Sequence, residues 1–202
     1  MNQMLAAPRW GCFALVSYIP DLLSSFLQGL REILPNTDSS EAHITLLPPR
    51  PLKLPVEIAS KQARAILRQF PPFEVELSKV RRFPETKFLY LDLAEGNSVI
   101  HDLHDALNKG DLFDPEEFEF RPHLTLGGPV SPGVLDSAQQ QAEITWNAEH
   151  CASRFTIEEV VCLWSSPDSA QGEWRKLWNE KLSPTAARTS AATATVTSRR
   201  TS

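Results

Sequence analysis

Two short segments of this chain repeat one pattern of polar and aliphatic side chains, 80 residues apart. Ala42-His43-Ile44-Thr45-Leu46 matches Pro122-His123-Leu124-Thr125-Leu126, so His-x-Thr-Leu occurs twice in a chain that has five histidines. Successive side chains of a β-strand point to opposite faces. The pattern therefore predicts two strands that bury their aliphatic residues under helices and present a histidine and a threonine on the open face.

Apolar runs of strand and helix period alternate along the rest of the chain, separated by prolines and glycines. We expect strands at 11–19, 42–47, 73–82, 87–94, 118–126 and 155–164, helices at 22–34, 56–70, 97–107 and 133–148, and an element of undecided type at 174–182. This order predicts an α+β fold with a largely antiparallel sheet. Each half contains a strand–helix–strand unit with one His-x-Thr-Leu copy, which indicates an internal duplication.

The chain length of 202 residues is typical of one domain, which we place at residues 10–183. Residues 184–202 are rich in Thr, Ala, Ser and Arg with one apolar valine, and we expect a disordered tail there. We see neither a membrane span nor a secretory signal, and the three cysteines cannot all pair with one another. These features favour reduced thiols in a cytoplasmic protein, and we expect a monomer.

The distribution of charge limits the class of partner. The formal net charge is −5, and the segment after Pro184 contains three arginines and no acidic residue. The preceding body therefore carries 17 basic against 25 acidic residues. A body of this charge does not suit a protein that grips long nucleic acid through many phosphates. It leaves open a small phosphate-bearing ligand or a single RNA end.

If the two halves are related by a pseudo-two-fold axis, the two His-Thr pairs face each other across a groove. Such a groove suits phosphodiester chemistry. One neutral imidazole takes a proton from the attacking water or hydroxyl, and the other, protonated, donates to the leaving oxygen. Threonine hydroxyls hold the phosphate oxygens between them. The scheme needs neither a metal nor a cofactor.

The duplicated motif, with its lead-in Phe120-Arg121-Pro122 before His123, resembles the 2H phosphoesterase superfamily. That superfamily includes 2′-5′ RNA ligase-like proteins and RNA 2′,3′-cyclic phosphodiesterases. The resemblance spans the order of elements from about Trp10 to Leu182. It implies a bilobal, pseudo-two-fold α+β fold with a central cleft. It also implies that His43 and His123 are the acid/base pair and that Thr45 and Thr125 are phosphate ligands.

The expected reaction is the opening of a 2′,3′-cyclic phosphate at an RNA end or on a nucleotide. The reverse direction would make the protein a 2′-5′ RNA ligase. We expect Arg121 to contact the phosphate, because it shares a strand face with His123, and Arg50 to be a second phosphate neighbour. Phe88 and Tyr90 alternate with leucines and are candidates to stack on a base. The basic cluster Lys79, Arg81, Arg82 and Lys87 could guide a polyanion, although a solvated hairpin is the commoner explanation.

Two other classes of function stay open. The groove could bind a nucleotide or RNA end without turning it over. Alternatively, His101 and His104, three residues apart on an expected helix, could hold a metal. Their aspartate neighbours favour a solvated helix face instead. The cysteines Cys12, Cys151 and Cys162 lack Cys-x-x-Cys spacing, and we expect Cys12 and Cys162 to pack in strands.

Overall fold

The computed structural model describes residues 11–36, 40–148, 153–166 and 173–183. It contains eight strands and four α-helices, with a short 3-10 turn at Gly110–Leu112. The strands are β1 (Cys12–Tyr18), β2 (His43–Pro51), β3 (Phe73–Arg82), β4 (Leu89–Glu95), β5 (Leu124–Gly127), β6 (Arg154–Ile157), β7 (Glu159–Ser165) and β8 (Trp174–Lys181). The helices are α1 (Asp21–Glu32), α2 (Val56–Leu67), α3 (Asn97–Leu107) and α4 (Pro132–Ala148).

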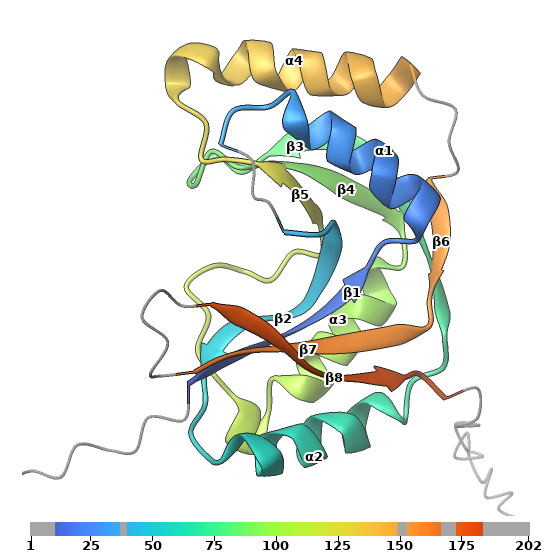
Figure 1. Ribbon diagram of the computed structural model, residues 1–202, viewed down its shortest axis with the longest axis vertical. Helices are drawn as coiled ribbons and strands as arrows, with labels where there is room; N and C mark the ends of the chain where they lie inside the picture. Colours follow the sequence, from blue (N-terminus) through green and yellow to red (C-terminus); the bar gives the residue numbers. More distant parts are fainter. Residues whose placement is uncertain (1–10, 37–39, 149–152, 167–172, 184–202) are drawn as a thin grey trace, which may run out of the picture.

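All eight strands form one curled antiparallel sheet in the order β6-β3-β4-β5-β2-β1-β7-β8 (Figure 1). The two strands that carry His-x-Thr are the central pair. Each is flanked by three further strands, so the sheet divides at β5 and β2 into two matching halves. This is the predicted α+β, pseudo-two-fold arrangement, built as one continuous sheet.

The helices cover the sheet in two pairs. Helices α1 and α4 pack together over the β5 half, and α2 and α3 pack together over the β2 half (Figure 1). The chain crosses between the halves more than once, because α1 joins β1 to β2 but covers the β5 half, and α3 joins β4 to β5 but covers the β2 half. The leucine-rich core lies between these helices and the sheet and includes Ile44, Leu46, Leu124 and Leu126, all fully buried. No helix within the described ranges is long and apolar enough to cross a membrane.

Three predicted boundaries are wrong. β2 does not stop at Pro48 but continues to Pro51. Past Leu47 this strand pairs with β1 on one side, and a strand with a free edge tolerates residues that lack an N–H. The predicted strand 155–164 is divided at Glu158, where β6 leaves β3 and β7 joins β1.

The third error concerns the predicted strand 118–126, because the strand observed there, β5, begins only at Leu124 and ends at Gly127. The preceding residues form a loop, which we call the pocket loop (residues 113–123). Pro115 and Pro122 cannot donate to a sheet, and side chains of this loop bind α3 and β2 instead. The undecided element at 174–182 is strand β8. The expected tail lies outside the described residues.

Candidate active site

The two His-x-Thr segments meet at the centre of the sheet. Ile44 of β2 is the antiparallel partner of Leu124 of β5. That register places Thr45 opposite His123 and His43 opposite Thr125. All four side chains therefore share one face, and the two histidines are diagonal neighbours, at a usual separation of about 7–8 Å.

Burial follows the same alternation in both segments. Ile44, Leu46, Leu124 and Leu126 are 0% exposed, whereas both histidines and both threonines are half-buried. The burial classes of residues 41–50 and 121–130 agree at every position. The predicted division into an aliphatic inner face and a polar open face is thus present in each half.

Each imidazole is oriented by the backbone two residues before it. His43 Nδ1 lies 2.7 Å from the carbonyl oxygen of Glu41, and His123 Nδ1 lies 2.7 Å from that of Arg121. A carbonyl oxygen only accepts hydrogen bonds, so Nδ1 carries the proton and donates in both rings. Nε2 is then the nitrogen that can gain or lose a proton in each histidine.

The two imidazoles have different surroundings. His43 meets Tyr18 edge-to-face, whereas His123 meets both Phe83 and Tyr90 edge-to-face, with ring centroids 4.9 and 5.4 Å away. Burial lowers the pKa of His123, and the nearby positive groups His43 and Arg121 lower it further. The backbone hydrogen bond and Asp92 act in the opposite direction. The net effect favours the neutral imidazole at His123.

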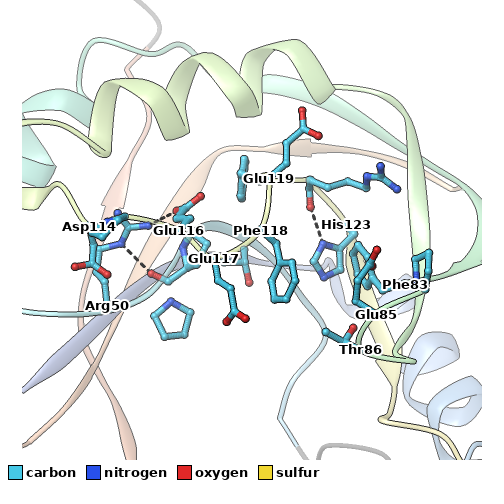
Figure 2. Close-up of a pocket in the computed structure, with 17 residues that line it drawn as sticks. Arg50, Phe83, Glu85, Thr86, Asp114, Glu116, Glu117, Phe118, Glu119 and His123 are labelled. Atoms are coloured by element: carbon cyan, nitrogen blue, oxygen red, sulfur yellow. Dashed lines mark hydrogen bonds and ion pairs between the residues drawn. The ribbon is translucent and has the colours of Figure 1, made fainter.

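A pocket of about 660 Å³ opens beside the sheet centre, and His123 and Thr45 form part of its wall. The rest of the wall comes from β2, from the β3–β4 hairpin and from the pocket loop (Figure 2). The lining residues are Thr45, Pro48, Pro49, Arg50, Phe83, Pro84, Glu85, Thr86, Asp114, Pro115, Glu116, Glu117, Phe118, Glu119, Phe120, Arg121 and His123. His43 and Thr125 lie on the same sheet face, opposite each other in the register, but they are not among the residues that line this pocket.

The pocket loop is fixed to the body of the protein at two points. Glu116 accepts a hydrogen bond from Arg50 at 2.6 Å (Figure 2). Its carboxylate also lies 2.9 Å from His104 Nε2. Phe120 stacks on the His104 ring, with centroids 3.9 Å apart and planes 7° from parallel. Arg50 also donates to Asn108 Oδ1 at 2.5 Å and is only 2% exposed.

These contacts change the interpretation of three basic residues. Arg50 was expected beside a phosphate, but its guanidinium is committed to Glu116 and Asn108. Burial lowers the pKa of Arg50, and Glu116 partly offsets that cost. His104 was expected on a solvated helix face and is instead 5% exposed against the pocket loop, while His101 is exposed. Within the described part of the chain, no group of three or more His, Cys, Asp or Glu residues could hold a metal ion.

The three expected substrate contacts have different positions. Arg121 is exposed, lines the pocket and donates from Nη1 to the Tyr90 hydroxyl at 3.1 Å. Tyr90 is 2% exposed and lies beneath Phe83, on which it stacks at 4.2 Å. Phe88 packs closely against Gly128. A Cβ atom added to Gly128 would lie only 2.8 Å from the Cα atom of Phe88. The aromatic residue that this hairpin contributes to the pocket wall is Phe83.

The basic cluster lies partly in ion pairs. Arg81 approaches Asp92 at 3.8 Å, and Arg82 contacts Asp136 at 2.5 Å. The described thiols are Cys12 and Cys162, both free. Burial raises the pKa of the Cys162 thiol to about 12, so it is protonated at neutral pH.

Sequence reasoning missed the acidic and aromatic part of the pocket wall. Phe83, Glu85, Glu117 and Phe118 had no motif to mark them. The available signal was the run Asp-Pro-Glu-Glu-Phe-Glu-Phe at 114–120, whose charges and proline are atypical of a buried strand. The run lies just before His123 in the sequence, but only the fold shows that it forms part of a pocket wall.

Comparison with known proteins agrees with this site. Residues 19–169 match the family model of the 2′-5′ RNA ligase superfamily. A protein of Geobacillus thermodenitrificans named "Putative phosphoesterase" is 32% identical over 143 residues, which cover 66% of this chain and 78% of that protein. A protein of Geobacillus kaustophilus with a similar name is 29% identical over 131 residues, which cover 60% of this chain and 71% of that protein.

Solved structures share the fold at low sequence identity. Escherichia coli LigT in complex with phosphate has a TM-score of 0.59 and 14% identity, covering 87% of this chain and 99% of LigT. LigT has also been solved with 3′-AMP, with a TM-score of 0.58 at 14% identity, covering 87% of this chain and 99% of LigT. The structure of a Thermus thermophilus protein has a TM-score of 0.58 at 14% identity, and the match covers 85% of this chain and 97% of that protein. By its sequence match over three quarters of its length, the chain belongs to the 2′-5′ RNA ligase superfamily of 2H phosphoesterases.

Proposed function

We propose that this phosphoesterase opens 2′,3′-cyclic phosphates on nucleotides or at RNA ends, without a metal, by acid–base catalysis from His43 and His123. The observation that carries the proposal is the matched pair of imidazoles. Each has Nδ1 fixed by a backbone carbonyl at 2.7 Å and a threonine two residues later on the same sheet face. Two Nε2 atoms facing one groove can serve both sides of an in-line displacement at phosphorus.

In the hydrolytic direction, His123 is the base. Its lowered pKa keeps Nε2 unprotonated near neutral pH, so it can take a proton from water as the water oxygen bonds to phosphorus. The P–O3′ bond then breaks, and His43 Nε2–H donates its proton to the departing O3′. The product carries a 2′-phosphate, and proton exchange with solvent restores both imidazoles.

The neighbouring residues hold the phosphate. Thr45 and Thr125 donate hydrogen bonds to its non-bridging oxygens, and Arg121 offers a positive charge at the rim of the pocket. With a 5′-hydroxyl RNA end as the attacking group, the same residues would run the reverse reaction and form a 2′-5′ linkage. LigT, a structural neighbour, has been solved with phosphate and with 3′-AMP, which supports a nucleotide-sized ligand.

The test is turnover of the four nucleoside 2′,3′-cyclic monophosphates in the presence of a chelator. His43→Gln and His123→Gln should each lower kcat by about 10²–10⁴-fold, because a positioned acid or base contributes that much. His101→Gln, in an exposed histidine of α3, is the matched control and should stay within two-fold of the wild type. Full activity in either active-site variant, or loss of activity to the chelator, would contradict the proposal. Binding without turnover in a folded wild-type protein would indicate a nucleotide-binding protein instead.

A further inference from the structure

The pocket beside His123 has an unusual charge for a phosphoester site. Its wall contains five carboxylates, Glu85, Asp114, Glu116, Glu117 and Glu119, against the two guanidinium groups of Arg50 and Arg121. A site that follows an RNA backbone is expected to be lined by positive charge. The excess of negative charge here lies within the same 660 Å³ cavity as the proposed base.

Only part of this negative charge is neutralised. Glu116 is paired with Arg50 at 2.6 Å, and Asp114 lies 3.7 Å from Lys53. Among the residues that the structure describes, no salt bridge involves Glu85, Glu117 or Glu119, and all three are exposed. The guanidinium group of Arg121, at the rim of the pocket, provides the positive charge that can accommodate a single phosphate.

The segment that carries Glu117 and Glu119 is held in place on both sides. Glu117, Phe118 and Glu119 are flanked on one side by Glu116, bound to Arg50 and His104, and on the other by Phe120, stacked on His104. In the view of Figure 2, Phe118 lies between Glu117 and His123. Phe118 is 53% exposed although it lines the pocket, so its ring is available to an apolar or aromatic group. A ligand whose phosphate is at His123 therefore meets an aromatic ring and then negative charge.

We propose that the pocket loop selects a phosphoester with one phosphate and an uncharged or cationic organic group, and rejects polyanions such as oligoribonucleotides. The inference rests on the proposed function and narrows its substrate class to mononucleotide-sized phosphoesters. The first phosphate is stabilised by Thr45, Thr125 and Arg121, whereas each further phosphate near the loop is repelled by Glu117 and Glu85. An amino or hydroxyl group can instead donate to these carboxylates.

The test compares a nucleoside 2′,3′-cyclic monophosphate with a short oligoribonucleotide that ends in the same cyclic nucleotide. In wild-type protein, kcat/KM should be higher for the mononucleotide. For the oligonucleotide it should rise as NaCl increases from about 0.02 to 0.3 M, because salt screens repulsion. Glu117→Gln should raise oligonucleotide kcat/KM about two- to five-fold at low salt and so narrow the difference in kcat/KM between the two substrates. Glu32→Gln, which removes an exposed charge on α1 outside the pocket, should change neither.

A binding measurement separates this inference from the proposed reaction. Dissociation constants are measured for a nucleoside 2′-monophosphate and for the oligonucleotide ending in a 2′-phosphate, in wild type and Glu117→Gln. Charge selection is supported if the mononucleotide binds more tightly than the oligonucleotide and Glu117→Gln reduces the difference between the two dissociation constants. If that result comes without any turnover, only the proposed reaction is contradicted. Oligonucleotide preference that weakens with salt, in binding or turnover, overturns the charge selection and leaves the reaction standing.

Discussion

At the scale of single residues, the site depends on differences between two histidines with the same sequence context. Both donate Nδ1–H to a carbonyl two residues earlier, so both use Nε2. The surroundings then separate them. His123 lies among Phe83, Tyr90 and Arg121, which desolvate it or repel its proton, and burial is the main cause of its lowered pKa. Asp92, which the register of β4 and β5 places opposite His123, is the opposing negative charge.

Asp92→Asn should move the acidic limb of the pH–rate profile to lower pH. Asp92 stabilises the imidazolium of His123, so its removal lowers the pKa further and leaves His123 neutral over a wider range. In the wild type, the midpoint of this acidic limb should already lie below pH 6.5, the usual pKa of histidine, because the pKa of His123 is lowered. The measurement is log kcat/KM against pH between about 4.5 and 8.5, with Asp136→Asn as the charge-matched control. A shift to higher pH would contradict the assignment of that limb to His123.

At the scale of elements, the pocket loop shows why a strand could be expected where none forms. Apolar residues alternate at Phe118, Phe120, Leu124 and Leu126, which predicts one continuous strand. Only its last part, Leu124–Gly127, forms a strand, β5. In the earlier part, Phe120 stacks on the ring of His104 instead of joining the sheet. Glu116, two residues before the predicted strand, pairs with the buried Arg50, which would otherwise be a buried charge without a carboxylate partner.

Arg50→Met should destabilise the fold and release the pocket loop. Removal of one partner of a buried ion pair costs about 3–5 kcal/mol, which is reduced here because Glu116 is partly exposed and can be hydrated. Urea unfolding measures the loss, and protease cleavage within residues 113–123 should become faster under native conditions. Arg175→Met, in an exposed ion pair of β8, should change stability by less than about 0.5 kcal/mol. Unchanged cleavage in Arg50→Met would show that the loop is held by other contacts.

At the scale of the whole molecule, the two halves of one sheet bring their motifs together at a narrow seam. In the described structure, β2 pairs with β5 at Ile44 and Leu124 alone, whereas the pairing of β1 with β2 extends over most of both strands. The separation of the histidines is therefore fixed largely by packing on the helix side. Ile44 and Leu124 are both 0% exposed there.

Ile44→Ala should lower activity out of proportion to its effect on stability. The cavity left by a buried Ile or Leu replaced by Ala costs about 2–5 kcal/mol, and Leu67→Ala in α2 should cost a similar amount. Only the change at Ile44 loosens the seam that sets the distance between the two imidazoles. The measurement is kcat well below Tm for both variants. Equal kcat losses in the two would show that the seam is not what positions the histidines.

The local features of this protein follow from its amino-acid sequence. Strand alternation placed His43 with Thr45 on one face of their strand, and His123 with Thr125 on one face of theirs, because successive side chains of a strand point to opposite faces. Most helices and strands were also predictable from periodicity, and the duplicated motif indicated the family. The chemical roles of the site residues remain predictions that the proposed experiments address.

The way in which distant segments combine depends on tertiary packing. The fold placed Arg50 against Glu116, stacked His104 on Phe120 and covered Tyr90 with Phe83. These partners are separated by 7 to 66 residues in sequence. Whether a charged side chain contacts solvent, a ligand or another residue depends on which segment the fold packs against it. Periodicity describes one element at a time, so it carries no such information.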